Sequence, residues 1–297
     1  MGSDSAATAA TPSTTSGADD SSGGSGSAGE SSGSSTGEPR PPVSGELEVL
    51  SYNVAGLPQG ISSSDPENNI PQMSVLLNAF GLVLAQEDFW YHDLLLADVE
   101  HPYLSDPFPA DPAKMGIGDG LNRMSQTPFA ELTREQWYDC NGMLDCANDC
   151  LARKGWSFAR HTLSEGVEVD VYNLHMEAGG CPEDLVIRAQ SALNLAESIA
   201  ELSDGRALIV AGDFNLRATD PEDVVPLANI VDGAGLTDVC DAVDCGDQRI
   251  DHIMIRSGET VVLEPMSWWI PEEFVDARTD EPLSDHLPVA AVIGWTG

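Results

Sequence analysis

The sequence is poor in positive charge and has no long apolar run. Its 297 residues include only 13 Lys and Arg against 49 Asp and Glu, so the formal net charge at pH 7 is −36. A surface this acidic repels nucleic-acid phosphates and anionic bilayers, so a nucleic-acid partner is not expected. No stretch has the roughly 20 consecutive apolar residues of a membrane-spanning helix. The composition fits an exported, well-solvated protein or one that binds divalent cations.

The first forty-odd residues lack the side chains that build a core. Residues 1–44 are mostly Ser, Gly, Thr, Ala and Pro with scattered acids, and they contain no Ile, Leu or aromatic residue. Such a segment buries too little apolar surface to offset the entropy lost on ordering. We therefore expect a disordered tether at 1–44 and one domain at 45–297. No signal-peptide pattern opens the sequence, and a tether starting at Met1-Gly2 indicates a mature bacterial protein, secreted or held on the outer cell surface, for instance as a lipoprotein.

The cysteines indicate an oxidising compartment. They are Cys140, Cys146, Cys150, Cys181, Cys240 and Cys245. An even number is typical of a disulfide-bonded exported protein, and Cys240 and Cys245 are spaced to close a short loop. The group from Cys140 to Cys150 offers zinc as an alternative, although no Cys-x-x-Cys pair or nearby His completes a tetrahedral set. The pairing stays open at this point.

Short apolar runs alternate with helical patterns along the rest of the chain, which predicts an α/β fold. Strands are expected at 46–54, 82–85, 154–161, 167–175, 207–211, 248–256 and 287–295, and helices at 70–80, 186–202 and 220–230. Residues 92–153 have poor periodicity and frequent Pro, Gly and Cys. We expect loops with short elements there, including a turn and strand near 118–125.

Polar residues stand where the expected strands end. They are Asn53, Glu87, Asn173, His175, Asp213, Asn215, Asp251, Asp285 and His286. Any one of them can be a solvated or capping residue, but so many at strand ends favour one shared site. Asp213 and Asn215 are two residues apart, so on a strand they would share a face. A carboxylate beside an amide that donates to an oxyanion suits phosphate-ester chemistry.

These residues resemble the endonuclease/exonuclease/phosphatase superfamily. The matching strings are Ser51-Tyr52-Asn53, Gln86-Glu87, Asn173-Leu174-His175, Gly212-Asp213-Phe214-Asn215, Arg249-Ile250-Asp251-His252-Ile253 and Ser284-Asp285-His286-Leu287-Pro288-Val289. They occur in the family's order and span the domain. The resemblance implies a four-layer α-β-β-α sandwich of two mixed sheets with outer helices. It also implies hydrolysis of phosphate esters with Mg²⁺, or with Mn²⁺, Co²⁺ or Ca²⁺ in its place.

The resemblance further implies the metal ligands and the base. Glu87 would be the main metal ligand, with Asn53 and Asp285 near the ion. A hard cation that keeps several waters takes oxygen ligands, commonly one or two carboxylates plus the substrate phosphate. His286 would be the general base, and Asp251 would orient it, because an Asp–His pair fixes the tautomer and raises the basicity of the ring.

The remaining roles also come from the resemblance. Asp213 would position the attacking water, and Asn215 would hold the phosphate. His175 would stabilise developing charge or assist the leaving group, with Asn173 beside it as a substrate contact. His252 stands where the family often has an aromatic residue, and we interpret it as structural.

The choice of ester depends on more variable segments. Residues 149–155, which include Lys154, resemble the Asn-Lys-Gly region of secreted bacterial sphingomyelinases. Those enzymes carry an aromatic hairpin where Trp268 and Trp269 stand, so the pair either touches a membrane or lies in the core. Lys154 is a candidate phosphate contact. We expect a monomeric, secreted phosphodiesterase of sphingomyelinase type that acts on a lipid head group. The alternatives are a nuclease or inositol-lipid phosphomonoesterase of the same superfamily and, from another class, a catalytically silent surface binding protein.

Overall fold

A computed structural model describes residues 42–109, 117–142, 146, 149–152, 154–246 and 249–297. The expected tether therefore lies, up to residue 41, outside the described residues. Within the described ranges the chain forms two six-stranded sheets. No helix in these ranges is both long and apolar enough to cross a membrane.

The first sheet has the strand order β11-β12-β1-β2-β4-β3. Its strands are β1 (Ser44–Asn53), β2 (Leu82–Gln86), β3 (Tyr103–Leu104), β4 (Asn122–Ser125), β11 (Val262–Trp269) and β12 (Val289–Thr296). β1 and β2 are parallel and the other neighbours are antiparallel, so the sheet is mixed. Asn53 and Glu87 therefore emerge at the same edge, where both parallel strands end.

The second sheet has the strand order β5-β6-β7-β8-β10-β9. Its strands are β5 (Phe129–Gln136), β6 (Gly155–Ser164), β7 (Val167–His175), β8 (Leu208–Asp213), β9 (Thr237–Asp238) and β10 (Asp251–Arg256). β7 and β8 are parallel, which brings His175 directly opposite Asp213. Gly212 makes this pairing possible, because a Cβ there would lie 2.0 Å from the Leu174 carbonyl oxygen and its φ is +152°.

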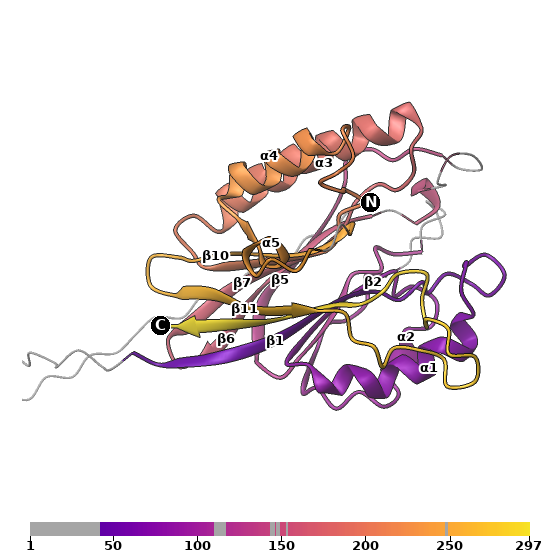
Figure 1. Cartoon of the computed structure of the whole chain (residues 1–297), viewed down its shortest axis with the longest axis horizontal. Coiled ribbons are helices and arrows are strands. Elements are labelled where there is room, and N and C mark those ends of the chain that lie inside the picture. Colours follow the sequence, from indigo (N-terminus) through magenta and orange to yellow (C-terminus); the bar gives the residue numbers. More distant parts are fainter. Residues whose placement is uncertain (1–41, 110–116, 143–145, 147–148, 153, 247–248) are drawn as a thin grey trace, which may run out of the picture. The chain divides into compact units, whose positions relative to one another are not determined.

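Helices cover the outer faces of both sheets. They are α1 (Pro66–Leu76), α2 (His92–Leu95), α3 (Pro182–Leu202) and α4 (Val224–Ala234), with 3₁₀ turns at Leu77–Ala79 and Asp149–Leu151. The short helix α5 (Val239–Ala242) instead packs against β10 and β11, and its Val239 belongs to the apolar layer between the sheets. In Figure 1, α3 and α4 lie together over the second sheet, and α1 and α2 lie on the far side of the first. The four-layer sandwich expected from the sequence is confirmed.

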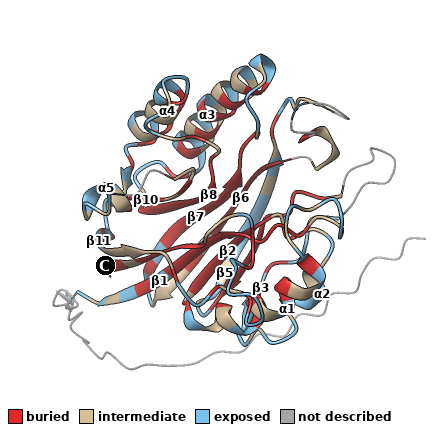
Figure 2. Cartoon of the chain, turned by 45° about the vertical axis from the view of Figure 1, so that its right-hand side comes forward, coloured by how far each residue is buried: buried red, intermediate tan, exposed pale blue. Residues whose placement is uncertain are grey.

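The core has three apolar layers that follow from the alternation of strand side chains. One lies between the sheets and includes Val49, Val171 and Ile209. Another joins the second sheet to α3 and α4, and a third joins the first sheet to α1. Because neighbouring residues on a strand face opposite ways, a strand buried on both faces reads as continuously apolar. Figure 2 shows the central strands of both sheets buried and the outer faces of the helices exposed.

Several details differ from the sequence expectation, among them β11, a strand over residues for which none was expected. β5 is an eight-residue strand in a region where only short elements were expected, and most of its residues are exposed, so it carries no apolar signal. α1 begins at Pro66, before the apolar spacing that predicted it, since Pro is favoured at the first helical position. α4 runs to Ala234 and ends at Gly235, whose φ of +66° forms a left-handed cap.

The cysteines are paired as disulfides. Cys240 bonds to Cys245, as expected, and the other bonds are Cys140–Cys150 and Cys146–Cys181. A zinc site at Cys140, Cys146 and Cys150 is therefore wrong, because those sulfurs bond to sulfur.

Candidate active site

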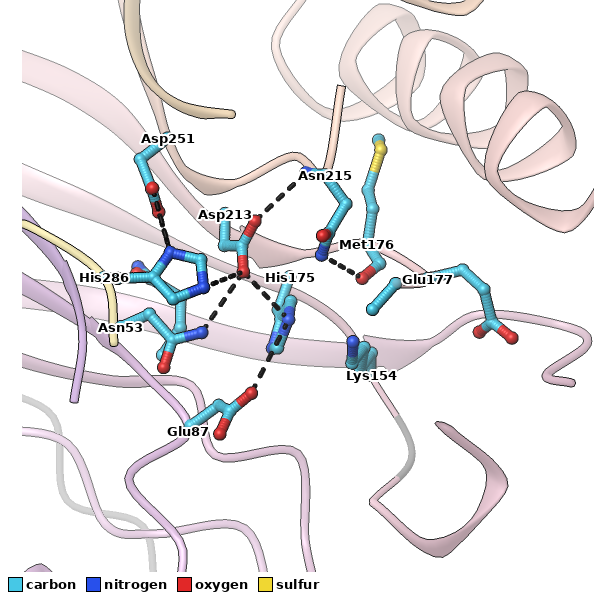
Figure 3. A network of polar contacts seen from close by, with 12 residues as sticks. Asn53, Glu87, Lys154, His175, Met176, Glu177, Asp213, Asn215, Asp251 and His286 are labelled. Atoms are coloured by element: carbon cyan, nitrogen blue, oxygen red, sulfur yellow. Dashed lines mark hydrogen bonds and ion pairs between the residues drawn. The ribbon is translucent and has the colours of Figure 1, made fainter. Parts of the chain in front are cut away.

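Asp213, the last residue of β8, is the centre of a polar network that joins the two sheets (Figure 3). Asn53 Nδ2, from the first sheet, donates to Asp213 Oδ2 over 3.1 Å. His175 Nε2, from β7, lies 3.1 Å from the same oxygen, and His286 Nε2 lies 3.6 Å away. Burial alone would raise the pKa of Asp213, but the charges of His175 and His286 outweigh it and hold the pKa well below its usual range.

His286 and Asp251 form a hydrogen-bonded pair. His286 Nδ1 lies 2.9 Å and 3.2 Å from the two carboxylate oxygens of Asp251, which leaves Nε2 directed toward Asp213. The Ser284 hydroxyl donates to the Asn53 carbonyl oxygen and so fixes the segment that carries His286. Burial opposes protonation of the ring, yet the Asp213 charge and the Asp251 hydrogen bond raise the pKa of His286 to about 10.

His175 is buried between Asp213 and Glu87. Its Nε2 lies 4.0 Å from Glu87 Oε1, and its backbone carbonyl accepts a 2.7 Å hydrogen bond from Trp137 Nε1. Within the described part of the chain, Nδ1 is buried without a hydrogen-bond partner. The ring is therefore held by its backbone and by two carboxylates on one side.

Glu87 has the properties of a ligand for a hard cation. It follows β2 with a φ of +55°, its carbonyl accepts from Gly56 N at 3.0 Å, and its side chain is 20% exposed. Among the described residues, no hydrogen-bond donor reaches its carboxylate within 3.5 Å. Within the described ranges, the nearby Asn53 Oδ1 accepts a hydrogen bond only from Ala55 N. This set of underused oxygens fits Mg²⁺, which prefers oxygen ligands and retains waters.

Two further groups bear on a metal. Asp285 is exposed beside His286, and its carboxylate accepts hydrogen bonds from the Ser63 and Ser284 hydroxyls. Asp213, Asp251 and His286 also offer ligand atoms within 4.8 Å of one another. In that trio, however, His286 is already hydrogen-bonded to Asp251, an arrangement typical of an acid–base pair.

Asn215 reaches the site by a turn and not along the strand. β8 ends at Asp213, and Asn215 has a φ of +49°. Its backbone N–H donates to Asp213 Oδ1 and its Nδ2 donates to the Met176 carbonyl, both over 3.0 Å. The expectation that Asp213 and Asn215 share a strand face is wrong, although the turn does place the amide beside the carboxylate.

Two expected substrate contacts lie away from the open part of the site. Asn173 is fully buried between the sheets, where it accepts from Gln86 Nε2 and donates to the Ala85 and Asn122 carbonyls. Lys154 Nζ is paired with Asp149 Oδ1 at 2.8 Å, and its side chain is only 5% exposed. The structure gives both side chains partners within the protein.

Sequence reasoning missed a second set of polar residues behind His175. Glu177 is buried and accepts a hydrogen bond from Asn141 N, and Asp149 Oδ2 accepts from Ala178 N. Burial and the neighbouring Asp149 charge raise the pKa of Glu177 to about 7. The available signal was its position two residues after His175, on the same segment as the Met176 carbonyl that holds Asn215.

The adjacent tryptophans are partly buried. Trp268 packs against the apolar layer between the sheets. Trp269 packs against the layer beneath α1 and stacks on Phe80, with ring centroids 6.4 Å apart. This packing favours the structural interpretation that the sequence left open.

Comparison with solved structures identifies the fold. An endonuclease/exonuclease/phosphatase family protein from Bacteroides thetaiotaomicron aligns with a TM-score of 0.61 at 19% identity, over 85% of this chain and 98% of that one. Beta toxin from Staphylococcus aureus with bound magnesium ions aligns at 0.60 and 17%, over 83% and 99%. Sphingomyelinase C from Streptomyces griseocarneus aligns at 0.59 and 17%, over 84% and 99%. The protein thus has the endonuclease/exonuclease/phosphatase fold.

Sequence comparison narrows the relationship. No protein-family model matches the chain. A curated sphingomyelinase from Mycobacterium tuberculosis is 34% identical over 277 aligned residues, which cover 86% of this chain and 54% of that protein. The chain spans about half the length of the curated relatives it matches. Over the aligned stretch the chain is homologous to curated bacterial sphingomyelinases, and its fold is that of endonuclease/exonuclease/phosphatase family proteins, in agreement with the sequence motifs.

Proposed function

We propose that the protein is a Mg²⁺-dependent phosphodiesterase of sphingomyelinase type. The observation that carries this proposal is the network in which Asn53, His175 and His286 converge on Asp213 while Asp251 holds the far side of His286. Beside this network lies Glu87, whose carboxylate oxygens accept no hydrogen bond from the residues that the structure describes. The homology to curated sphingomyelinases and a fold shared with a magnesium-bound toxin support the same assignment.

The acid–base chemistry follows from the arrangement of the rings. The carboxylates that raise the pKa of His286 to about 10 favour a protonated ring in the metal-free protein, and the positive charge of a bound cation would oppose them and favour the neutral ring. Neutral His286 would accept a proton from the attacking water at Nε2, and Asp251 would stabilise the imidazolium that results. Asp213, 3.6 Å from that nitrogen, accepts a hydrogen bond from the water and orients it toward phosphorus. The new P–O bond forms as the ester bond on the opposite side breaks, which releases an alcohol and a phosphate monoester.

The leaving group and the phosphate need separate support. His175 Nε2 donates toward the departing oxygen or its developing charge, and Asn215 donates to a phosphate oxygen with its remaining N–H. Glu87 and Asn53 would hold Mg²⁺, with Asp285 near it. When bound, the ion neutralises charge on the phosphate oxygens and on the leaving oxygen. Because water is the nucleophile, the chemistry requires no Ser or Cys nucleophile.

We also propose that the protein acts outside the cell as a monomer, secreted or held at the outer surface by its N-terminal tether, with a lipid anchor as one form of attachment. Three disulfides support an oxidising compartment. The net charge of −36 supports a lipid head group over nucleic acid as substrate.

A substrate panel tests the proposal. Sphingomyelin, phosphoinositides, bis-p-nitrophenyl phosphate and plasmid DNA are incubated with the full chain and Mg²⁺, and released phosphate esters are measured. We expect sphingomyelin to be hydrolysed fastest. Preferential cleavage of DNA would contradict the lipid assignment, and preferential dephosphorylation of a phosphoinositide would identify a phosphomonoesterase. No hydrolysis of any ester would favour a silent binding protein.

A further inference from the structure

Two loops at the open edge of the first sheet form one rigid unit, which we call the front rim. It consists of residues 55–64, after β1, and residues 87–93, after β2. Gly56 N donates to the Glu87 carbonyl over 3.0 Å, and Trp90 N donates to the Gly56 carbonyl over 3.1 Å. Gln59 N donates to Tyr91 Oη over 2.8 Å. These three hydrogen bonds join the two loops, so the loops are held in one arrangement relative to each other.

The front rim borders the solvent-accessible side of the site. Glu87 and His286 are 20% and 19% exposed, whereas Asp213 and His175 are 1% exposed. A phosphate ester must therefore approach from the side of Glu87 and His286. The front rim contains Glu87 itself, and Ser63 within it hydrogen-bonds to Asp285.

The front rim presents large apolar side chains to solvent. Ile61 is 71% exposed and Trp90 is 62% exposed. Single exposed apolar residues are ordinary on protein surfaces. Here, however, both stand on loops that are hydrogen-bonded to each other and that flank the entrance of the site, whereas Trp268 and Trp269 pack against the core.

The negative charge around the front rim determines which lipid head groups the rim can approach. Residues 43–113 include no Lys or Arg, and Glu67 and Asp93 are exposed on or beside the rim. Asp65 is also exposed there, and it is paired with Arg278 at 3.8 Å, which leaves the acids of the rim in excess. An acidic surface repels anionic head groups. An exposed indole among carboxylates attracts quaternary ammonium groups, through the ring face and through charge.

We propose that the front rim docks the protein onto a zwitterionic bilayer whose outermost charges are quaternary ammonium groups, with Trp90 and Ile61 entering the interface. The location rests on the proposed function, because the rim is relevant to catalysis only if the substrate lies in that bilayer. Tryptophan is favoured at the boundary between head groups and acyl chains, where one part of the ring is apolar and another polar. Docking here brings the phosphate layer of the bilayer to Glu87 and His286.

Vesicle binding tests the proposal apart from catalysis. The full chain, Trp90→Ser, Ile61→Ser and the double variant are sedimented with phosphatidylcholine vesicles and with phosphatidylglycerol vesicles. The matched control is Val262→Ser, an exposed residue of β11. Its partner on β12, Thr296, pairs in turn with Ser44 at the start of β1, at the opposite end of that strand from Asn53. We expect the double variant to lose at least tenfold in affinity for phosphatidylcholine and the control to bind as the parent chain does.

Three results would overturn the docking surface. They are unchanged binding by the double variant, equal loss in the Val262→Ser control, and tighter binding of the parent chain to phosphatidylglycerol than to phosphatidylcholine. Thermal unfolding of each variant shows whether a loss reflects misfolding, which is not expected at exposed positions.

Sphingomyelin turnover in neutral detergent micelles and in vesicles separates this inference from the proposed function. We expect the double variant to lose much more activity on vesicles than on micelles. If the parent chain hydrolyses sphingomyelin but the variant's loss is equal in both, the docking surface is wrong and the enzyme assignment stands. If the parent chain hydrolyses no ester but the variant loses vesicle binding, the docking surface stands and the enzyme assignment fails.

Discussion

The front rim and the region behind His175 support the same site by different means. The front rim contains no cysteine, and backbone hydrogen bonds hold it together. The region behind His175, which we call the braced wall, comprises the described residues among 137–154 and 176–184. It is crossed by Cys140–Cys150 and Cys146–Cys181 and contains the buried pair Lys154–Asp149.

The two regions differ in whether their carboxylates are available to bind a ligand or are used in contacts within the protein. In the front rim, Glu87 has carboxylate oxygens without a hydrogen-bond donor among the described residues, so they remain free for a cation. In the braced wall, Glu177 accepts from Asn141 and Asp149 accepts from Ala178 and pairs with Lys154. These contacts hold residues 175–178 in position. They therefore also fix the Met176 carbonyl oxygen to which Asn215 Nδ2 donates. We interpret the wall as positioning and the front rim as ligand-binding.

The largest effect is expected at the catalytic histidine. His286→Ala removes the proposed base, and we expect turnover of the substrate identified by the panel to fall by about a thousandfold. The matched control is His252→Ala, since His252 also pairs with an aspartate, Asp238, at 2.7 Å, but lies outside the network around Asp213. We expect the control to keep at least a third of the activity. Equal losses in the two variants, with both folded by circular dichroism, would contradict the assignment of the base.

Removal of the metal tests the ligand-binding character of the front rim. With EDTA we expect activity to disappear and to return on addition of Mg²⁺. Glu87→Gln keeps the shape of the side chain but removes its charge, so it should raise the Mg²⁺ concentration for half-maximal activity by at least tenfold. Magnesium titrations of the parent chain and the variant measure this. An enzyme indifferent to EDTA would refute the metal assignment.

Loss of Lys154 tests the positioning character of the braced wall. Lys154→Met leaves Asp149 buried without its cation, and removing one partner of a buried pair costs about 3–5 kcal/mol. We expect the denaturation midpoint to fall, and the double variant Lys154→Met/Asp149→Asn to recover part of the loss. If Lys154 instead bound phosphate, as the sequence resemblance implied, the single variant would raise KM and leave unfolding unchanged.

The smallest effect is expected from the protonation of His286 in the metal-free protein. The neighbouring carboxylates raise its pKa from 6.5 to about 10, so the folded state binds this proton more tightly than the unfolded state. Its contribution to stability is complete below pH 6.5 and is lost as the pH rises through about 10. In EDTA, the difference in melting temperature between the parent chain and His286→Gln should therefore shrink over that range. A constant difference from pH 6 to pH 10 would contradict the raised pKa.

Much of the fold, and the positions of the site residues that follow strands, could be predicted because both depend on local sequence patterns. Asn53, Glu87 and Asp213 stand at the ends of apolar strands, and those strands are parallel neighbours within their sheets. The buried partners of Asn173 and Lys154 could not be predicted, because these contacts join segments that are distant in sequence and meet only when the sheets and loops pack together. β5 was missed for a related reason, since an exposed edge strand buries little and needs no apolar pattern.

The division of the network between two sheets affects when activity can appear. Asn53, Glu87 and the segment with His286 that leads into β12 belong to the first sheet, whereas His175, Asp213 and Asp251 come from the second. Asn53 Nδ2 and the His286 ring reach Asp213 from the first sheet. A chain that has completed only one sheet possesses either the cation-binding groups or most of the proton-transfer groups. The proposed site is therefore complete only after the two sheets have packed against each other.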